Sequence, residues 1–296
     1  MDFAQQAWDD FDIRRVRDVS WLGIAQIRTS TRPFDDSPEL RQIVEERLAA
    51  RFAPLARSLN GAAVVCGDMS GERHKFEHYS RIAFAHVDGF DLSPKSLDRV
   101  VSSAFRFTPH AADCNTFTLE PARYHLIVGL HGIHHLQEVD RLFAQCHGAL
   151  ADGGLLLIEE YVGPPRLQIP RVNLWIARLL LTLLFRRSER TNHEGRVKGR
   201  WIQYPPEAFD PSEAVNAPSI PGALTRWFEP IHRRDYGGLL YPMFEGLAAN
   251  FTRPSQRIAF VIRVERLLQR LRIVRPLFLF AIAGKRGRNS IHPNEA

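Results

Sequence analysis

Short apolar runs alternate with amphipathic stretches through the middle of the chain. The apolar runs predict strands at 62–66, 86–91, 107–111, 125–128 and 155–158. Apolar positions at helical spacing predict helices at 94–104 and 137–150. Strands that alternate with helices in this way are typical of a parallel sheet covered by helices.

The pattern changes on both sides of this region. Apolar side chains recur with a helical period along residues 39–59, so we expect 1–59 to form an N-terminal helical segment. Residues 166–228 combine an apolar helix at 172–185 with basic and proline-punctuated loops, which indicates a cap inserted over the carboxyl edge of the sheet.

Two more apolar runs follow the predicted cap. They predict strands at 230–234 and 277–283, separated by a long helical region at 239–271. We therefore expect an α/β fold with a seven-stranded, mostly parallel sheet, helices on both faces and an inserted helical cap. The core would comprise 60–165 and 229–290, and the cap 166–228.

Composition narrows the class of protein. The chain has 296 residues and a net charge of +6, and 35 of its 39 basic residues are arginines spread along its length. Because no DNA- or RNA-binding motif accompanies them, we expect no nucleic-acid partner. The three cysteines lack ligand-like spacing, and the longest apolar stretches are shorter than the ~18 residues that a membrane span needs. We expect a cytoplasmic protein without a transmembrane segment.

Small and acidic residues follow the first two predicted strands. The first leads into Cys66-Gly67-Asp68-Met69, a turn where backbone N–H groups can approach a ligand closely. Asp68 could instead cap a helix. The second ends at Asp91-Leu92, and an acid there can accept hydrogen bonds from the ribose hydroxyls of a nucleoside cofactor. The alternative is that Asp91 assists the helix cap at Ser93.

Polar or small residues also stand next to the third, fourth and fifth predicted strands. Asp113-Cys114 follows the third predicted strand, where an acid could accept from an adenine amino group. After the fourth strand, a loop that begins at Leu130 contains His131, His134 and His135. Gly153-Gly154 precede the fifth strand, which ends in Glu159-Glu160-Tyr161.

This ordered set resembles a class I S-adenosylmethionine-dependent methyltransferase with a Rossmann-like fold. The carboxyl half is similar to a bacterial group of these enzymes associated with glycan and natural-product pathways. That likeness rests on Glu160-Tyr161-Val162-Gly163-Pro164, Arg166, Gln168, the run 210–215, Tyr236-Gly237-Gly238 and Ala249-Asn250-Phe251. Together, the resemblance covers roughly residues 60–285.

The resemblance implies S-adenosylmethionine as cofactor and a small or sugar-containing acceptor that is methylated at oxygen. It places the cofactor against Cys66, Gly67, Asp68, Met69, Asp91, Leu92, Asp113, Cys114, Leu130 and His131. His134 and His135 become the candidate bases, since imidazole accepts protons near neutral pH. Glu160, Tyr161, Arg166, Gln168 and Tyr236 become candidates for binding the acceptor.

Some features leave alternatives open. The family's first motif is Gly-x-Gly-x-Gly, but Val65 and Met69 stand at the outer glycine positions, so either the turn is reshaped around the cofactor or affinity is lost. A non-catalytic binding protein or an NAD(P)-dependent oxidoreductase would share part of the pattern. The helix at 172–185 is either a buried cap helix or a lid that touches a lipid-like substrate or a membrane surface.

No metal ion is expected. The three histidines of the loop are close in sequence, but no neighbouring cysteine or acid completes a ligand set around them. The oligomeric state is not predicted.

Overall fold

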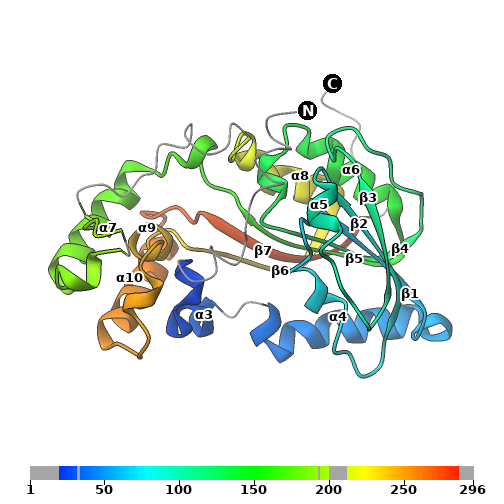
Figure 1. Ribbon diagram of the computed structural model, residues 1–296, viewed down its shortest axis with the longest axis horizontal. Helices are drawn as coiled ribbons and strands as arrows, with labels where there is room; N and C mark the ends of the chain where they lie inside the picture. Colours follow the sequence, from blue (N-terminus) through cyan, green and yellow to red (C-terminus); the bar gives the residue numbers. More distant parts are fainter. Residues whose placement is uncertain (1–19, 32–33, 193, 200–211, 287–296) are drawn as a thin grey trace.

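The computed structural model describes residues 20–31, 34–192, 194–199 and 212–286. A seven-stranded sheet forms its centre, with the strand order β3-β2-β1-β4-β5-β7-β6 (Figure 1). The strands are β1 (Leu59–Val64), β2 (Phe84–Asp91), β3 (Arg106–Ala111), β4 (Tyr124–Leu130), β5 (Leu150–Tyr161), β6 (Phe228–Tyr236) and β7 (Phe278–Lys285).

Neighbouring strands from β3 to β5 pair in parallel, whereas β7 pairs antiparallel with both β5 and β6. The predicted α/β fold with a mostly parallel seven-stranded sheet is therefore confirmed. All seven residues of β4 are buried, which is the expected pattern for a strand covered on both faces. The carboxyl ends of β1, β2, β4 and β5 lie at the same edge, where parallel sheets bind ligands.

Helices flank this sheet. They are α3 (Ala25–Thr31), α4 (Pro38–Arg51), α5 (Pro94–Leu97), α6 (Val139–Ala149), α7 (Arg171–Leu184), α8 (Ile220–Trp227), α9 (Leu240–Phe244) and α10 (Gln256–Arg270). Short 3₁₀ helices occupy Trp21–Gly23, Phe34–Asp36, Ala53–Leu55, Arg73–Lys75, Ile133–His135, Pro165–Leu167, Ser188–Arg190, Ala217–Ser219 and Ala248–Asn250.

Two predicted helices are shorter than expected. The helix predicted at 94–104 ends at Leu97, because the β-branched Val100 and Val101 and the serines after them favour other backbone conformations. The region 239–271 is split into α9 and α10: α9 ends just before Gly246, which adopts a left-handed φ of 79°, and α10 begins only after Pro254. Of the predicted segment 1–59, residues 1–19 lie outside the described part, and β1 already begins at Leu59.

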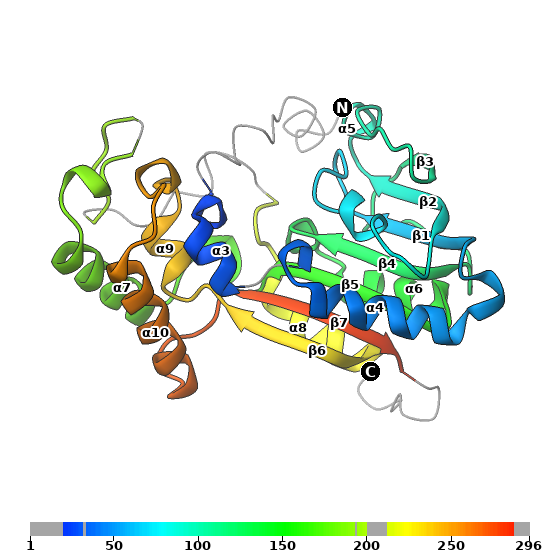
Figure 2. The same cartoon turned by 90° about the horizontal axis from the view of Figure 1, so that it is seen from below.

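The helices form two groups. In Figure 1 the sheet lies between α4 on one side and α6 with α8 on the other. A second group, α3, α7, α9 and α10, forms a lobe beyond the end of the sheet (Figure 2). The segment 166–228, predicted as a cap, contains both α7 and α8. Since α7 belongs to the lobe and α8 packs against α6 beside the sheet, this segment contributes to both groups. The predicted domain boundaries remain a prediction.

Two buried polar side chains attach the lobe to the sheet. The Asn173 side chain of α7 donates to the carbonyls of Gly238 (3.0 Å) and Arg275 (2.7 Å). The carboxylate of Glu265 in α10 accepts from the N–H groups of Gly237, Leu239 and Leu240 at 2.6–3.2 Å. Since both side chains bind the chain near the end of β6 and the start of β7, they fix the lobe against the carboxyl edge.

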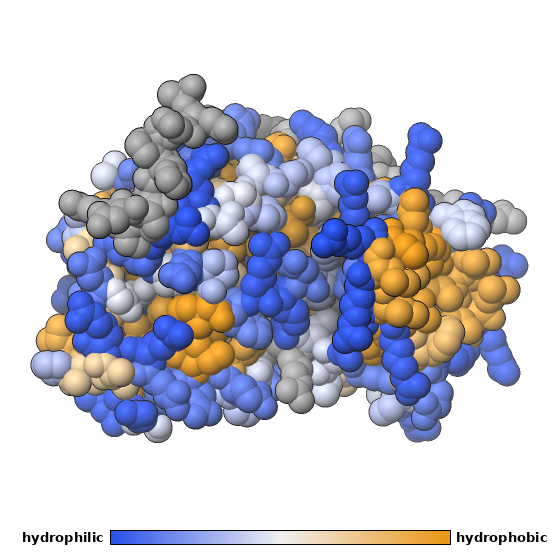
Figure 3. Space-filling view, turned by 180° about the vertical axis from the view of Figure 1, so that it is seen from behind, coloured by the Kyte–Doolittle hydropathy of each residue, from blue (hydrophilic) through white to orange (hydrophobic). Residues whose placement is uncertain are grey.

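The outer face of the lobe is apolar. Figure 3 shows apolar side chains gathered on one side of the molecule with long hydrophilic side chains around them. On α7 the exposed apolar residues are Val172, Trp175, Leu179 and Leu183. Among the described residues, none of the helices combines the length and apolar character that crossing a membrane requires.

Candidate functional site

The turn after β1 has an unusual backbone. Val65, Gly67 and Met69 adopt φ of 52°, 50° and 54°, in the left-handed region that favours glycine. The backbone thus keeps a glycine-type conformation at the two positions where the chain carries other residues. A left-handed β-branched residue such as Val65 is strained, and such strain is typical of binding turns held by their surroundings.

Asp91 connects this turn to β2. Its Oδ2 accepts from the Gly67 N–H at 2.8 Å and its Oδ1 from the Ser93 N–H at 2.9 Å. Burial raises the pKa of the Asp91 carboxyl, although the N–H groups of Ser93 and Gly67 oppose this effect. A Cβ added at Gly67 would have no neighbour within 4 Å, so the space beside the turn is open.

Other predicted cofactor residues surround this pair. Cys66 and Cys114 are buried, Met69 is buried, and Leu92 is half-buried. Asp68 accepts from the Ser70 N–H at 3.0 Å in a local turn. The next helical element begins at Arg73 with Glu72 as its N-cap, so Asp68 does not cap it.

Asp113 is exposed and caps a turn of its own. Its Oδ1 accepts from the Asn115 N–H and from the Asn115 side-chain amide, both at 2.9 Å. Asn115 in turn accepts from the N–H groups of Gln137 and Glu138, which precede α6. Asp113 is therefore held at the surface just after β3, whose last residue, Ala111, pairs with Asp91 of β2.

The histidine loop lies directly against the β1 turn. A Cβ added at Gly132 would meet the Val65 carbonyl oxygen at 2.4 Å, so only glycine permits this approach. The carboxylate of Glu160 fixes the loop: Oε1 accepts from the N–H groups of Gly132 (2.9 Å) and Ile133 (2.8 Å). His131 is exposed, with a left-handed φ of 54°.

His134 and His135 are brought together with an acid from a distant part of the chain. His134 Nδ1 lies 2.8 Å from Glu160 Oε2, and its Nε2 lies 3.5 Å from Glu213 Oε1. His135 Nδ1 lies 3.1 Å from Ser212 Oγ, and its Nε2 lies 3.9 Å from Glu213 Oε2. Burial alone would lower the pKa of His134, but the hydrogen bonds to Glu160 and Glu213 raise it to about 10.

Glu213 and Ser212 had no predicted role. Both belong to the run 210–215, which contributed to the family resemblance, so the sequence did mark this segment. No spacing rule, however, connects Glu213 with the histidine loop, where His135 lies 78 positions earlier. We expected no metal ion because no acid accompanies the histidines along the sequence. In the folded chain that premise is wrong, because Glu213 supplies one.

The predicted acceptor-binding residues have different surroundings. The Tyr161 hydroxyl donates to the Pro164 carbonyl at 3.1 Å, and the Tyr236 hydroxyl donates to Glu159 Oε1. Arg166 is half-buried and its N–H binds the Ala214 carbonyl at 3.1 Å, whereas Gln168 is exposed. Tyr161 lies near the histidines, with its ring centroid 6.3 Å from that of His134.

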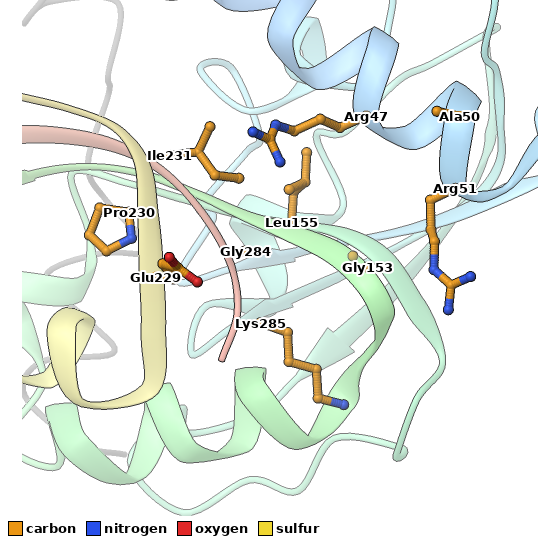
Figure 4. A pocket seen from close by; sticks show the side chains of 11 residues that line it. Arg47, Ala50, Arg51, Gly153, Leu155, Glu229, Pro230, Ile231, Gly284 and Lys285 are labelled. Atoms are coloured by element: carbon orange, nitrogen blue, oxygen red, sulfur yellow. The ribbon is translucent and has the colours of Figure 1, made fainter. Parts of the chain in front are cut away.

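A separate cleft of about 700 Å³ lies away from this site. Figure 4 shows Arg47 and Arg51 of α4 facing it from one side and Glu229 and Lys285 from another. Gly153 and Leu155, near the amino end of β5, also line it. It is thus at the edge of the sheet opposite to Asp91 and the histidine loop.

A family model described as a methyltransferase domain matches residues 40–210. No curated protein matches the sequence. Similar solved structures include an S-adenosylmethionine-dependent methyltransferase from Mesorhizobium loti, with 19% identity and a TM-score of 0.43 over 82% of this chain and 98% of that one.

Two further similar structures extend over nearly the whole of this chain. Geranyl diphosphate C-methyltransferase from Streptomyces coelicolor A3(2) has 12% identity and a TM-score of 0.45, covering 96% of each chain. Phosphoethanolamine N-methyltransferase 2 from Haemonchus contortus has 17% identity and a TM-score of 0.44, covering 95% of this chain and 60% of that one.

The family match spans more than half of the chain. The fold agrees with it in the sheet order, in the antiparallel β7 and in the turn after β1, which is hydrogen-bonded to Asp91. The protein therefore belongs to the methyltransferase-domain family and has its Rossmann-like fold.

Proposed function

We propose that this methyltransferase takes its methyl group from S-adenosylmethionine and transfers it to an oxygen of a small or sugar-containing acceptor. The observation that carries the proposal is the contact between the Asp91 carboxylate and the Gly67 N–H at the open β1 turn. An acid in this place, with lone pairs left over, can accept hydrogen bonds from both ribose hydroxyls. When bound, the cofactor supplies an electrophilic methyl group.

The β1 turn suits the rest of the cofactor. Its three left-handed residues turn the backbone tightly, and no side chain fills the space over Gly67. Met69 and Cys66 pack beneath the turn and hold its shape. The residues present therefore fit the cofactor although two glycines of the family motif are absent.

The acceptor side would be formed by the histidine loop. His135 is close enough to Asp91 for its charge to lower the carboxyl pKa, so the loop adjoins the proposed cofactor site. Transfer to a hydroxyl needs an aligned oxygen and a way to remove its proton. We assign this task to His134 and His135, with Glu160 holding the loop and Tyr161 beside it.

The exposed face of α7 supports a second, peripheral contact. Trp175 and Leu183 are 66% and 72% exposed, and Arg171, Arg178, Arg186 and Arg187 are exposed around them. Burial of apolar side chains together with attraction between arginines and anionic lipid headgroups is the energetic basis of interfacial helices. We propose that this face meets an anionic membrane surface from which a lipid-like acceptor could be drawn. A cytoplasmic location and a biosynthetic role remain predictions.

Calorimetric titration tests the cofactor assignment. We expect S-adenosylmethionine and S-adenosylhomocysteine to bind at one site per chain, and NAD(P) to show no heat of binding. Binding of NAD(P) alone would favour the oxidoreductase alternative. If none of these ligands binds the folded protein, a non-catalytic binding protein is the better description.

A further inference from the structure

The side chains of His134, His135 and Glu213 converge on one point at the carboxyl edge of the sheet. One ligand atom from each, two imidazole nitrogens and a carboxylate oxygen, lies within 4.8 Å of the others. We propose that these three residues form a binding site for a divalent transition-metal ion of the zinc class.

The orientation of the two rings matches that of metal ligands. In each ring Nδ1 is already engaged, by Glu160 Oε2 at 2.8 Å for His134 and by Ser212 Oγ at 3.1 Å for His135. The Nε2 atoms of both rings therefore face Glu213. Histidines that bind a metal through one nitrogen usually donate from the other to a carboxylate, a backbone carbonyl or water, which fixes the tautomer and the ring plane. Glu160 fits this pattern for His134, and Ser212 offers a hydroxyl oxygen to His135.

The spacing of the ligand atoms also fits. Metal–ligand bonds of about 2.0–2.1 Å in a tetrahedral arrangement separate the ligand atoms by roughly 3.3 Å. Glu213 Oε1 lies 3.5 Å from His134 Nε2, and Glu213 Oε2 lies 3.9 Å from His135 Nε2. One ligand atom from each residue lies within 4.8 Å of the others, so small side-chain rotations would close the set. Two histidines and one carboxylate leave a coordination position open, as in catalytic sites.

The ligands are held by the fold. Glu160, which orients His134, is fully buried (0% exposed) and also binds the N–H groups of Gly132 and Ile133. The segment that carries Glu213 is anchored by the Arg166 N–H on the Ala214 carbonyl and by the Asn216 amide on the Gln137 carbonyl. Ordered ligands lower the entropic cost of binding an ion.

The inference rests on the proposed function in one respect, the role of the ion. An ion at this point would displace the proton from His134 Nε2 and present its open position to the acceptor. A bound acceptor hydroxyl would release its proton to solvent water more readily, because a Lewis acid stabilises the alkoxide. The histidines would then act through the ion rather than as free bases.

Metal binding can be measured without any acceptor. Chelator-treated full-length protein is titrated with Co²⁺, whose visible absorption reports low-coordinate nitrogen–oxygen sites, and then with Zn²⁺ in competition. We expect one ion per chain, with affinity reduced at least tenfold in Glu213→Gln and in His135→Ala. Loss of the partner of His134 in Glu160→Gln should weaken binding by roughly 10–100-fold.

The second histidine–acid group of the described chain, His74, Glu77 and His78, provides the matched control. Glu77→Gln should leave the stoichiometry and the spectrum unchanged. Absence of binding, or binding that survives Glu213→Gln, would overturn the proposal and leave an ion-paired cluster of His134 with two carboxylates. Circular dichroism and S-adenosylmethionine titration of the same variants verify folding and separate failure of this site from failure of the cofactor assignment.

Discussion

At the scale of single residues, Asp91 carries two tasks. It positions the β1 turn through the Gly67 N–H, and in our proposal it also binds the cofactor ribose. Asp113 was expected to contribute beside it, and its cofactor role stays a prediction; its Oδ1 already accepts two hydrogen bonds from Asn115. The two acids should therefore differ strongly in their effect on cofactor binding.

We predict that Asp91→Ala weakens S-adenosylmethionine binding more than tenfold. Two hydrogen bonds to a charged acceptor are each worth about 1.5–3 kcal/mol, and loss of the Gly67 contact also loosens the turn. Asp113→Ala should have a smaller effect, since it removes at most one contact with the cofactor. Calorimetry on folded variants provides the test, and equal or reversed losses would show that the ribose acid has been assigned wrongly.

The histidine pair gives a second prediction. Replacing both His134 and His135 by alanine should lower turnover on a hydroxyl acceptor by roughly 10²–10⁴. Cofactor affinity should remain nearly intact, because these side chains face Glu213 rather than the β1 turn. His78→Ala, at an exposed histidine outside the site, is the control. Full turnover of the double variant would exclude the loop from proton transfer, and Tyr161 would then be the next candidate.

At the scale of elements, α7 combines an anchored and an unanchored face. Asn173 and Ala177 are buried against the rest of the lobe, while the opposite face of α7 exposes its apolar side chains. The sequence left open whether this helix is a buried cap or a lid with a second contact surface. One face of α7 is buried, as in a cap helix, and the other exposes apolar side chains, as in a lid with a contact surface. The helix therefore combines features of both descriptions.

We expect the double variant Trp175→Glu, Leu183→Glu to bind vesicles of anionic phospholipid at least tenfold more weakly than the parent chain. Both side chains would otherwise be buried in the interface, at about 1.5–3 kcal/mol for a large apolar side chain. Vesicle sedimentation measures the effect. Val101→Glu, at an apolar residue 74% exposed outside the lobe, should bind like the parent chain. Failure of the parent chain to sediment with these vesicles would refute a membrane role for the helix.

At the scale of the whole molecule, buried carboxyl groups make the free energy of unfolding depend on pH. Burial raises the pKa of Glu72, just after the β1 turn, to about 8 from an ordinary 4.5. Below pH 4.5 both folded and unfolded chains hold this proton. Between pH 4.5 and 8 only the folded chain keeps it, so the contribution of Glu72 to stability falls as the pH rises.

Glu72→Gln should therefore be less sensitive to pH than the parent protein. As the pH rises from 5 to 8, the variant should gain stability relative to the parent protein. We expect the difference between their free energies of unfolding to change by up to about 1.4 kcal/mol per pH unit. Denaturant unfolding at several pH values measures it. Glu77→Gln, which replaces a less buried acid nearby, controls for the change of charge. Parallel curves for Glu72→Gln and the parent would show that Glu72 is ionised in the folded state.

Features of the fold and of the candidate site could be predicted from the sequence where they depend on residues close together in the chain. The periodicity of apolar residues determines strands and helices locally, and so the seven strands and their α/β class were predictable. The acid at Asp91 was also predictable, because the strand that ends there fixes its place at the carboxyl edge. The early end of α5 and the break between α9 and α10 were missed, since local serine, valine, glycine and proline residues overrode an apolar pattern.

The tertiary structure alone decided the composition of the histidine site. Glu213 reaches His134 and His135 only because α8 and the chain before it return to the carboxyl ends of β4 and β5. The left-handed Val65 and Met69 are likewise maintained by packing against Gly132 and the core, against their own intrinsic preference. Sequence spacing determines which residues share a strand or a helix. Long-range packing determines which of these elements meet, and therefore which side chains act together.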